Sequence, residues 1–111
     1  MTVIGFLSVA PVREGSMAAD VAKAVDALDD FDVSYETTPM GTTIEAADVG
    51  TLLDAVEAAH EAVPGERVST FLKIDDKRTS EESAVEKVAG VERELGREAR
   101  RRREEKSDGE R

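Results

Sequence analysis

The segment from Pro39 to Glu45 carries an unusual density of side chains that could contact a small molecule. Within seven residues it holds a proline–glycine turn, a thioether, two hydroxyl groups and one carboxylate. A surface hairpin needs only turn residues at such a place, so the additional functional groups indicate a ligand site. The plainer alternative is a hairpin with β-branched strand residues and a solvated glutamate, and both readings fit the segment taken alone.

Strand geometry limits how these residues could act together. The missing side chain of Gly41 would permit either a positive φ or the close approach of a ligand to the backbone. Thr42 and Thr43 point to opposite faces of a strand, so only one of them can face a given pocket. Glu45 shares the face of Thr43. The candidate ligand-binding residues of the segment are Met40, Gly41, Thr42, Thr43 and Glu45.

Two further candidates, Ser8 and Asp75, lie in strand-like segments near the two ends of the chain. If those segments form the central strands of one sheet, the two side chains could approach each other. The alternative is that Asp75, with Lys73, simply solvates the end of a strand. The chain has no cysteine and one histidine, and it shows no phosphate-binding loop, nucleophile elbow or cluster of metal ligands. We therefore expect neither enzymatic activity nor a metal or cofactor.

The charge is unevenly distributed along the chain. The net charge is −10, yet the segment from Arg93 to Arg111 holds eight Lys/Arg and six Asp/Glu. The first 92 residues consequently carry seven basic and nineteen acidic residues. So acidic a body disfavours nucleic acid as a partner, because phosphates need a basic surface, and it favours cationic ligands. Adaptation to high salt would explain the same composition, and the two explanations are compatible.

Apolar periodicity predicts four strands, two crossover helices and one added helix. Their order matches the ferredoxin-like split βαβ arrangement (βαββαβ), an α+β fold whose crossover helices cover one face of an antiparallel sheet. We expect one domain over residues 1–96, followed by a charged tail at 97–111. That tail is expected to be a helix extension or disordered, with fast amide exchange from about Arg100. The predicted strands are 3–9, 33–37, 42–45 and 67–75, and the predicted helices begin at Ser16, at Asp48 and at a capping box of Thr79 with Glu82.

The uncovered face of this sheet is expected to be apolar, with Ile4, Phe6 and Phe71 exposed. An apolar patch of this kind usually marks an interface, so we expect a homo-oligomer, either a dimer or a tetramer, that buries this face with help from the last helix.

No apolar run reaches the length of a membrane span, and the first residues enter a strand without a basic leader. We therefore expect a cytoplasmic protein without a membrane partner. The side chains expected under the crossover helices are Val3, Leu7, Val68, Leu72 and Ile74, with Leu52 and Leu53 on the apolar face of the second helix and Asp20 on the solvent face of the first.

Five segments taken together resemble the small thiamine-binding proteins related to YkoF. They are Leu7–Pro11, Pro39–Glu45, the helix that contains His60 and Glu61, Arg67–Thr70 and Lys73–Arg78. The resemblance covers about residues 2–95 and is carried most specifically by the Met-Gly-Thr-Thr-Ile-Glu and Lys-Ile-Asp…Arg runs in that order. One departure is Ala46, where the family commonly has glycine. The resemblance implies a ferredoxin-like fold, oligomers formed through the sheets, and non-enzymatic binding of thiamine or its hydroxymethylpyrimidine part.

The resemblance also implies roles for the candidate residues. Thiamine carries a permanent thiazolium charge, an aminopyrimidine edge and a hydroxyethyl arm. Glu45 or Asp75 would balance the cation or accept from the exocyclic amine, and Met40 would pack against a ring. The hydroxyls of Ser8 and of Thr42 or Thr43 would serve the polar edges. Because no phosphate cradle is present, unphosphorylated thiamine is favoured over its diphosphate. The alternatives are an oligomeric structural or regulatory protein with another small ligand or none, and a salvage enzyme, which lacks a visible nucleophile and base.

Overall fold

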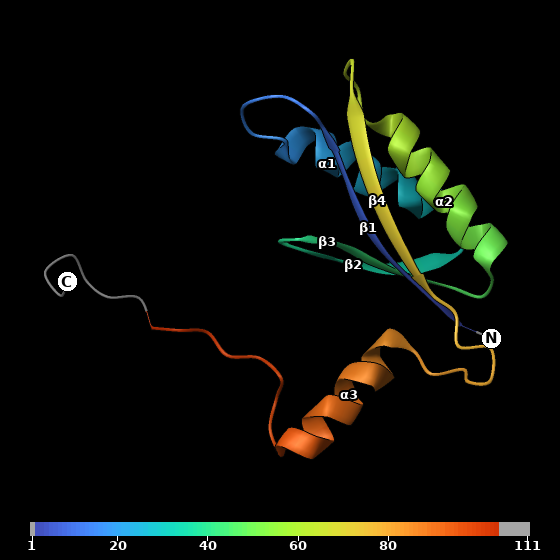
Figure 1. Cartoon of the computed structure of the whole chain (residues 1–111), viewed down its shortest axis with the longest axis vertical. Coiled ribbons are helices and arrows are strands. Elements are labelled where there is room, and N and C mark those ends of the chain that lie inside the picture. The colour runs from blue at the N-terminus through green and yellow to red at the C-terminus, as the bar shows by residue number, and fades with distance from the viewer. Residues whose placement is uncertain (1, 105–111) are drawn as a thin grey trace, which may run out of the picture.

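Four strands form one antiparallel sheet in the spatial order β2-β3-β1-β4, as seen in a computed structural model that describes residues 2–104 (Figure 1). This order is that of the split βαβ fold, so the predicted ferredoxin-like α+β class is confirmed. The elements are β1 (Val3–Pro11), α1 (Ala18–Ala27), the 3-10 turn η1 (Leu28–Asp30), β2 (Val33–Thr38), β3 (Gly41–Ala46), α2 (Val49–Ala62), β4 (Val68–Asp75) and α3 (Ala84–Leu95).

The hydrophobic core lies between α1, α2 and one face of the sheet. Side chains along β1 alternate strictly, with Val3, Leu7 and Val9 buried and Ile4 and Phe6 only half-buried on the other face. Because successive strand residues point to opposite faces, this alternation separates a helix-covered face from an open face. The core is aliphatic throughout and comprises Val3, Leu7, Val9, Ala24, Leu28, Ile44, Ala46, Leu52, Ala55, Val56, Ala59 and Val63.

The covered face is narrower than the sequence predicts. Leu52 of α2 is fully buried, whereas its neighbour Leu53 is 45% exposed. One residue corresponds to a rotation of about 100° around a helix, so both side chains cannot point at the same sheet. Ile74, near the end of the edge strand β4, is also 39% exposed. The expectation that the helices cover Leu53 and Ile74 is therefore wrong for this chain.

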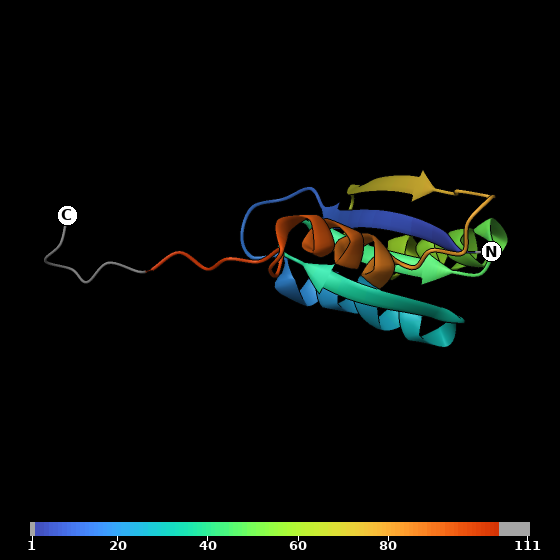
Figure 2. The same ribbon diagram turned by 90° about the horizontal axis from the view of Figure 1, so that it is seen from below.

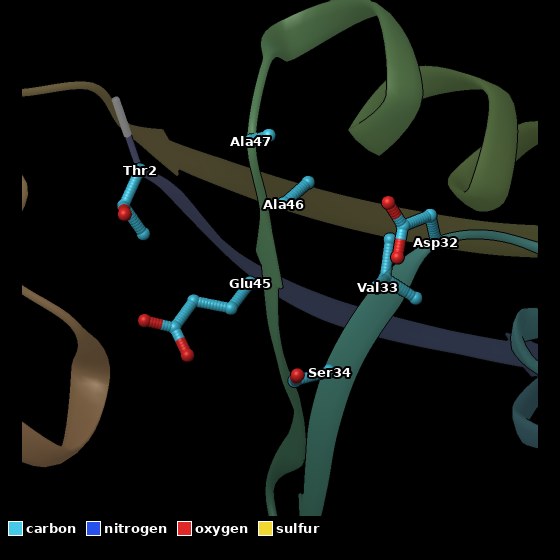
Figure 3. Close-up of a pocket in the computed structure, with 7 residues that line it drawn as sticks. All are labelled: Thr2, Asp32, Val33, Ser34, Glu45, Ala46 and Ala47. Atoms are coloured by element: carbon cyan, nitrogen blue, oxygen red, sulfur yellow. The ribbon is translucent and has the colours of Figure 1, made fainter.

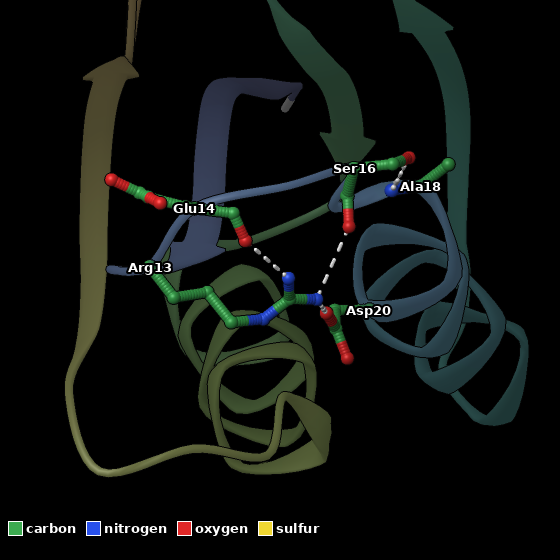
Figure 4. Close-up of polar contacts among 5 residues, drawn as sticks. All are labelled: Arg13, Glu14, Ser16, Ala18 and Asp20. Carbon is green, nitrogen blue, oxygen red and sulfur yellow. Dashed lines mark hydrogen bonds and ion pairs between the residues drawn. The ribbon is translucent and has the colours of Figure 1, made fainter.

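The loop between β1 and α1 is held by Arg13 (Figure 4). Its guanidinium forms an ion pair with Asp20 and donates to the carbonyl oxygens of Glu14, at 2.9 Å, and Ser16, at 3.2 Å. The Ser16 hydroxyl in turn accepts the backbone N–H of Ala18 at the start of α1. The expected solvent-facing position of Asp20 is wrong, since this carboxylate is only 7% exposed. Helical periodicity does not reveal a cationic partner that sits in the preceding loop.

The predicted helix starts are correct for α2 and displaced for α3. Asp48 caps α2 by accepting a backbone N–H of the first turn at 2.7 Å. The cap of α3 is Ser83, whose hydroxyl accepts the backbone N–H of Glu86, as in a capping box, and donates to the Glu86 carboxylate. The predicted pair of Thr79 and Glu82 is therefore four residues too early.

The third helix lies on the open side of the sheet, opposite α1 and α2 (Figures 1 and 2). It ends at Leu95, where Gly96 adopts a left-handed conformation with φ of 74°. Residues 97–104 form neither helix nor strand, and the rest of the predicted tail, 105–111, lies outside the described residues. Across residues 2–104, no helix is long and apolar enough to cross a membrane. The apolar residues of α3 are exposed, at 76% for Val85, 52% for Val88, 54% for Val91 and 47% for Leu95.

Candidate functional site

The strand register brings two predicted carboxylates to the same row of the open face. Ile4 of β1 pairs with Glu45 on one side and with Asp75 on the other. Neighbouring strands lie about 4.8 Å apart, so the Cα atoms of the two acidic residues are about 10 Å apart with Ile4 between them. Thr43 lies two residues along β3 on the same face, opposite Phe6. Glu45, Thr43 and Asp75 therefore share one surface.

Two other candidates from the hairpin do not reach this surface. Thr42 is only 4% exposed on the helix-covered face, where its hydroxyl shares a hydrogen bond of 3.1 Å with that of Thr37. The rule that only one of the two adjacent threonines can face a pocket thus selects Thr43 for the open face. Met40 is 78% exposed at the tip of the hairpin, at a different level of the sheet from the row that holds Glu45.

Ser8 lies on the open face but at a distance from the acidic row. It pairs with Phe71, whereas Asp75 pairs with Ile4, four residues earlier in β1. At a rise of about 3.3 Å per residue, the two rows are about 13 Å apart. The expectation that Ser8 and Asp75 approach each other is wrong, because the antiparallel register sets them at different levels of the sheet.

Gly41 leaves room for a neighbouring side chain of the same protein. A Cβ at this position would lie 2.6 Å from Cζ of Phe6 and 2.7 Å from the carbonyl oxygen of Leu7. The φ angle of Gly41 is not positive, so a left-handed turn is not the reason for the glycine. The sequence suggested that a ligand could come close to the backbone at Gly41. In the structure the ring of Phe6 occupies that position.

We expect Gly41→Ala to destabilise the protein by about 1–3 kcal/mol, the usual range for an overpacked site. The Phe6 ring can turn aside, but the Leu7 carbonyl belongs to the central strand and cannot move without disturbing the sheet. Urea unfolding checks this, with Gly50→Ala in the first turn of α2 as the control. A Cβ at Gly50 meets nothing closer than 3.4 Å, so that variant should be as stable as the wild type or slightly more stable. Equal stability of both variants would show that the hairpin absorbs the extra methyl group.

Both acidic residues of the shared row already contact α3. The Oε1 atom of Glu45 accepts the backbone N–H of Ala84, the first residue of the helix, at 2.8 Å. The Oδ2 atom of Asp75 accepts from Nζ of Lys87 at 2.8 Å. This hydrogen bond, and secondly the positive charge of Lys87, lower the pKa of Asp75. The same hydrogen bond and the negative charge of Asp75 raise the pKa of Lys87. The contact therefore persists at neutral pH and is lost as the pH falls through the lowered pKa of Asp75.

Two cavities meet at Glu45. One has a volume of about 300 Å³ and includes Thr2, Asp32 and Ser34 in its lining (Figure 3). The other, about 160 Å³, lies between the β2–β3 hairpin and the start of α3. Figure 3 shows the Glu45 side chain extending from β3 away from Asp32, in keeping with its contact to α3. The second cavity is lined by Ser34, Tyr35, Glu36, Thr43, Glu45, Ala84 and Val85.

The charged residues that line these two cavities are all acidic. They are Asp32, Glu36 and Glu45, so the local field favours a cation. Asp32 and Ser34 were not among the predicted residues. Ser34 is opposite Glu45 and Glu36 is opposite Thr43 in the β2–β3 pairing, so the alternation of β2 combined with the hairpin register would have found Ser34 and Glu36. Asp32 precedes β2, where alternation gives no signal.

A larger cavity of about 510 Å³ lies between α1 and β2 and includes Val21, Val25 and Tyr35 in its lining. It contains none of the predicted site residues. The Tyr35 hydroxyl donates to Asp29 at 2.6 Å, and this hydrogen bond is the main cause of the raised pKa of Tyr35. Among residues 2–104, no group of three or more His, Cys, Asp or Glu side chains is placed to hold a metal ion.

The fold and this surface define a ferredoxin-like domain with two adjoining cavities whose charged lining residues are acidic. The chain belongs to the thiamine-binding protein family, whose sequence pattern matches residues 6–92. A UPF0045 protein of Methanothermobacter thermautotrophicus is 45% identical over 83 residues, which cover 72% of this chain and 84% of the relative. The membership expected from the Met-Gly-Thr-Thr-Ile-Glu and Lys-Ile-Asp…Arg runs is thus confirmed.

Solved structures agree with this assignment. A hypothetical protein of Methanocaldococcus jannaschii superimposes with a TM-score of 0.76 at 31% identity, covering 81% of this chain and 95% of that protein. A Thermotoga maritima protein, described as a candidate thiamine biosynthesis or salvage protein, has a TM-score of 0.71 at 23% identity, covering 82% of this chain and 99% of its own. At that identity the second likeness supports the fold alone.

Proposed function

We propose that this protein binds thiamine, or its hydroxymethylpyrimidine part, on the open face of its sheet without catalysing a reaction on it. The observation that carries the proposal is the pair of cavities at Glu45, whose charged lining residues are all carboxylates, in a chain of the thiamine-binding family. A permanent cation gains from such a field, whereas a diphosphate would be repelled by it.

The chemistry of the surface suits the parts of thiamine. The Glu45 carboxylate, with a second oxygen in addition to the one bound to Ala84, would face the thiazolium charge or accept from the exocyclic amine. The hydroxyls of Thr43 and Ser34 border the same cavity and would serve the polar edges of the pyrimidine. Asp75 lies on the far side of Ile4 and adds a second carboxylate to the same row of the open face, outside the lining of the two cavities.

The protein is further proposed to act as a cytoplasmic homo-oligomer. Phe71 is 59% exposed on the open face, and the apolar residues of α3 are exposed on the same side of the sheet. Because Ala84, Val88, Val91 and Leu95 recur every three or four residues, they form one stripe, and Ala84 already faces the hairpin cavity. A second copy packed between this stripe and the open sheet would bury both apolar surfaces.

Calorimetry with thiamine tests the proposal, at high salt if the acidic body requires it. We expect saturable binding of thiamine, weaker or absent binding of thiamine diphosphate, and a molar mass by light scattering of a dimer or tetramer. The absence of saturable heat, together with an unchanged melting temperature, would refute thiamine as the ligand. The mass measurement addresses self-association separately.

A structural or regulatory oligomer is the second candidate, and one observation favours it. Glu45, the acidic residue of the hairpin motif, already holds the start of α3, so the motif could serve assembly alone. In that case Glu45→Ala would lose its oligomeric state while thiamine affected neither the wild type nor the variant.

A further inference from the structure

We infer that α3 is an internal competitor for the cationic ligand, so that ligand binding and docking of α3 against the sheet oppose each other. The inference rests on the proposed function and adds the regulation of the same site. It follows from where α3 touches the sheet, because the polar contacts between α3 and the strands, within residues 2–104, fall on the two carboxylates that flank Ile4.

The groups that α3 presents to these carboxylates carry the same sign as the ligand. Lys87 offers a full positive charge to Asp75 at 2.8 Å. Ala84 offers the first backbone N–H of the helix to Glu45 at 2.8 Å, and the N-terminus of a helix bears a partial positive charge. A cation placed between two acidic residues about 10 Å apart would repel both groups and replace them.

The attachment of α3 is weak enough to be replaced. The side chains of Lys87 and Asp75 are 42% and 50% exposed, and ion pairs this open to water contribute little because solvent screens them. The apolar residues of the helix add little burial, since Val88, Val91 and Leu95 all remain about half exposed. In one copy of the chain, α3 is therefore held mainly at its first turns.

The smaller of the two cavities at Glu45 leads to the same conclusion. The cavity between the hairpin and α3 has a volume of about 160 Å³, and Ala84 and Val85 form part of its wall. Sites for small organic molecules usually occupy about 300–1,000 Å³. Withdrawal of α3 would open this wall beside Glu45, so the same movement frees the carboxylates and enlarges the site.

Lys87→Gln tests the competition. Removing the competing charge should tighten thiamine binding by between about 1.4-fold and fivefold, the range that an exposed ion pair supports. Lys87→Arg keeps the charge and should bind like the wild type. Lys23→Gln, an exposed lysine on α1 on the covered side of the sheet, removes the same charge elsewhere and should leave the affinity unchanged. All four proteins are titrated by calorimetry at one ionic strength.

Amide hydrogen exchange gives an independent readout of the helix. Saturating thiamine should accelerate exchange in α3 of the wild type, because binding is linked to undocking in both directions. Thiamine that binds the wild type and Lys87→Gln equally, with unchanged exchange in α3, would overturn the competition and leave the proposed function standing. If thiamine binds neither protein, the proposed function fails and the competition fails with it. Tighter binding by Lys87→Gln but not by Lys23→Gln would support both.

Discussion

Replacing Leu52 by alanine is expected to lower the free energy of unfolding by about 2–5 kcal/mol. Leu52 is fully buried and lies where α2 crosses the central strand β1. Its two terminal methyl groups come within 3.0 and 3.1 Å of the position that a Cβ on Gly5 would occupy, so the strand carries a glycine where the leucine packs. Truncation would empty this space, and the rigid strand backbone on its other side cannot move in to fill it. A loss of this size is a large part of the about 5–15 kcal/mol that stabilises a typical domain.

Leu53→Ala is the matched control, since it makes the same chemical change one residue further along the helix. Leu53 is 45% exposed, so we expect a loss well below that of Leu52→Ala. Urea unfolding at low protein concentration, which limits any contribution from self-association, compares the two midpoints and slopes. Equal losses would mean that α2 is rotated relative to the sheet, so that Leu52 and Leu53 are buried to the same extent.

The contrast between Leu52 and Leu53 illustrates how much of the fold the sequence determines. Apolar periodicity located each strand and helix, because period-2 and period-3.6 patterns report which side of an element is buried. It did not determine the width of the buried stripe, since both leucines fit a broad apolar face. That width depends on how closely the helix approaches the sheet, which is a tertiary property.

The start of α3 shows a second kind of ambiguity. Two capping boxes follow each other, Thr79 with Glu82 and Ser83 with Glu86, and each satisfies the same local rule. The second is used, and Glu45 accepts the N–H of the next residue, Ala84, from 39 positions earlier in the chain. A contact over such a distance leaves no local trace in the sequence, just as Arg13 gave no sign of burying Asp20.

The candidate site was predictable where it depended on alternation and unpredictable where it depended on register. Alternation along β3 correctly placed Thr43 with Glu45 and separated Thr42 from both. The pairing of Ile4 with Glu45 and Asp75 requires the offsets of three strands at once, and a shift of two residues would keep every side chain on its face. For this reason Asp75 joined Glu45 while Ser8, on the same face, lies at another level.

Glu45→Gln is expected to weaken thiamine binding by about tenfold to a hundredfold, the effect of removing a charged hydrogen-bond partner. Glutamine keeps the length and the acceptor oxygen of the side chain but removes the negative charge next to the proposed cation. Glu57→Gln, on the exposed face of α2, also removes one negative charge but leaves the open face unchanged, and it should bind like the wild type. Calorimetry at two salt concentrations compares them, since salt screens the charge that Glu45 contributes.

The loss in Glu45→Gln combines two effects of opposite sign. Removing the carboxylate deletes the attraction for the cation, but it also weakens the contact between β3 and the first residue of α3, which should favour the ligand. Adding Lys87→Gln to Glu45→Gln releases the remaining competitor at Asp75, so the double variant should recover part of the affinity while staying weaker than Lys87→Gln alone. A Glu45→Gln protein that binds thiamine as tightly as the wild type would show that the Glu45 carboxylate does not hold the cation.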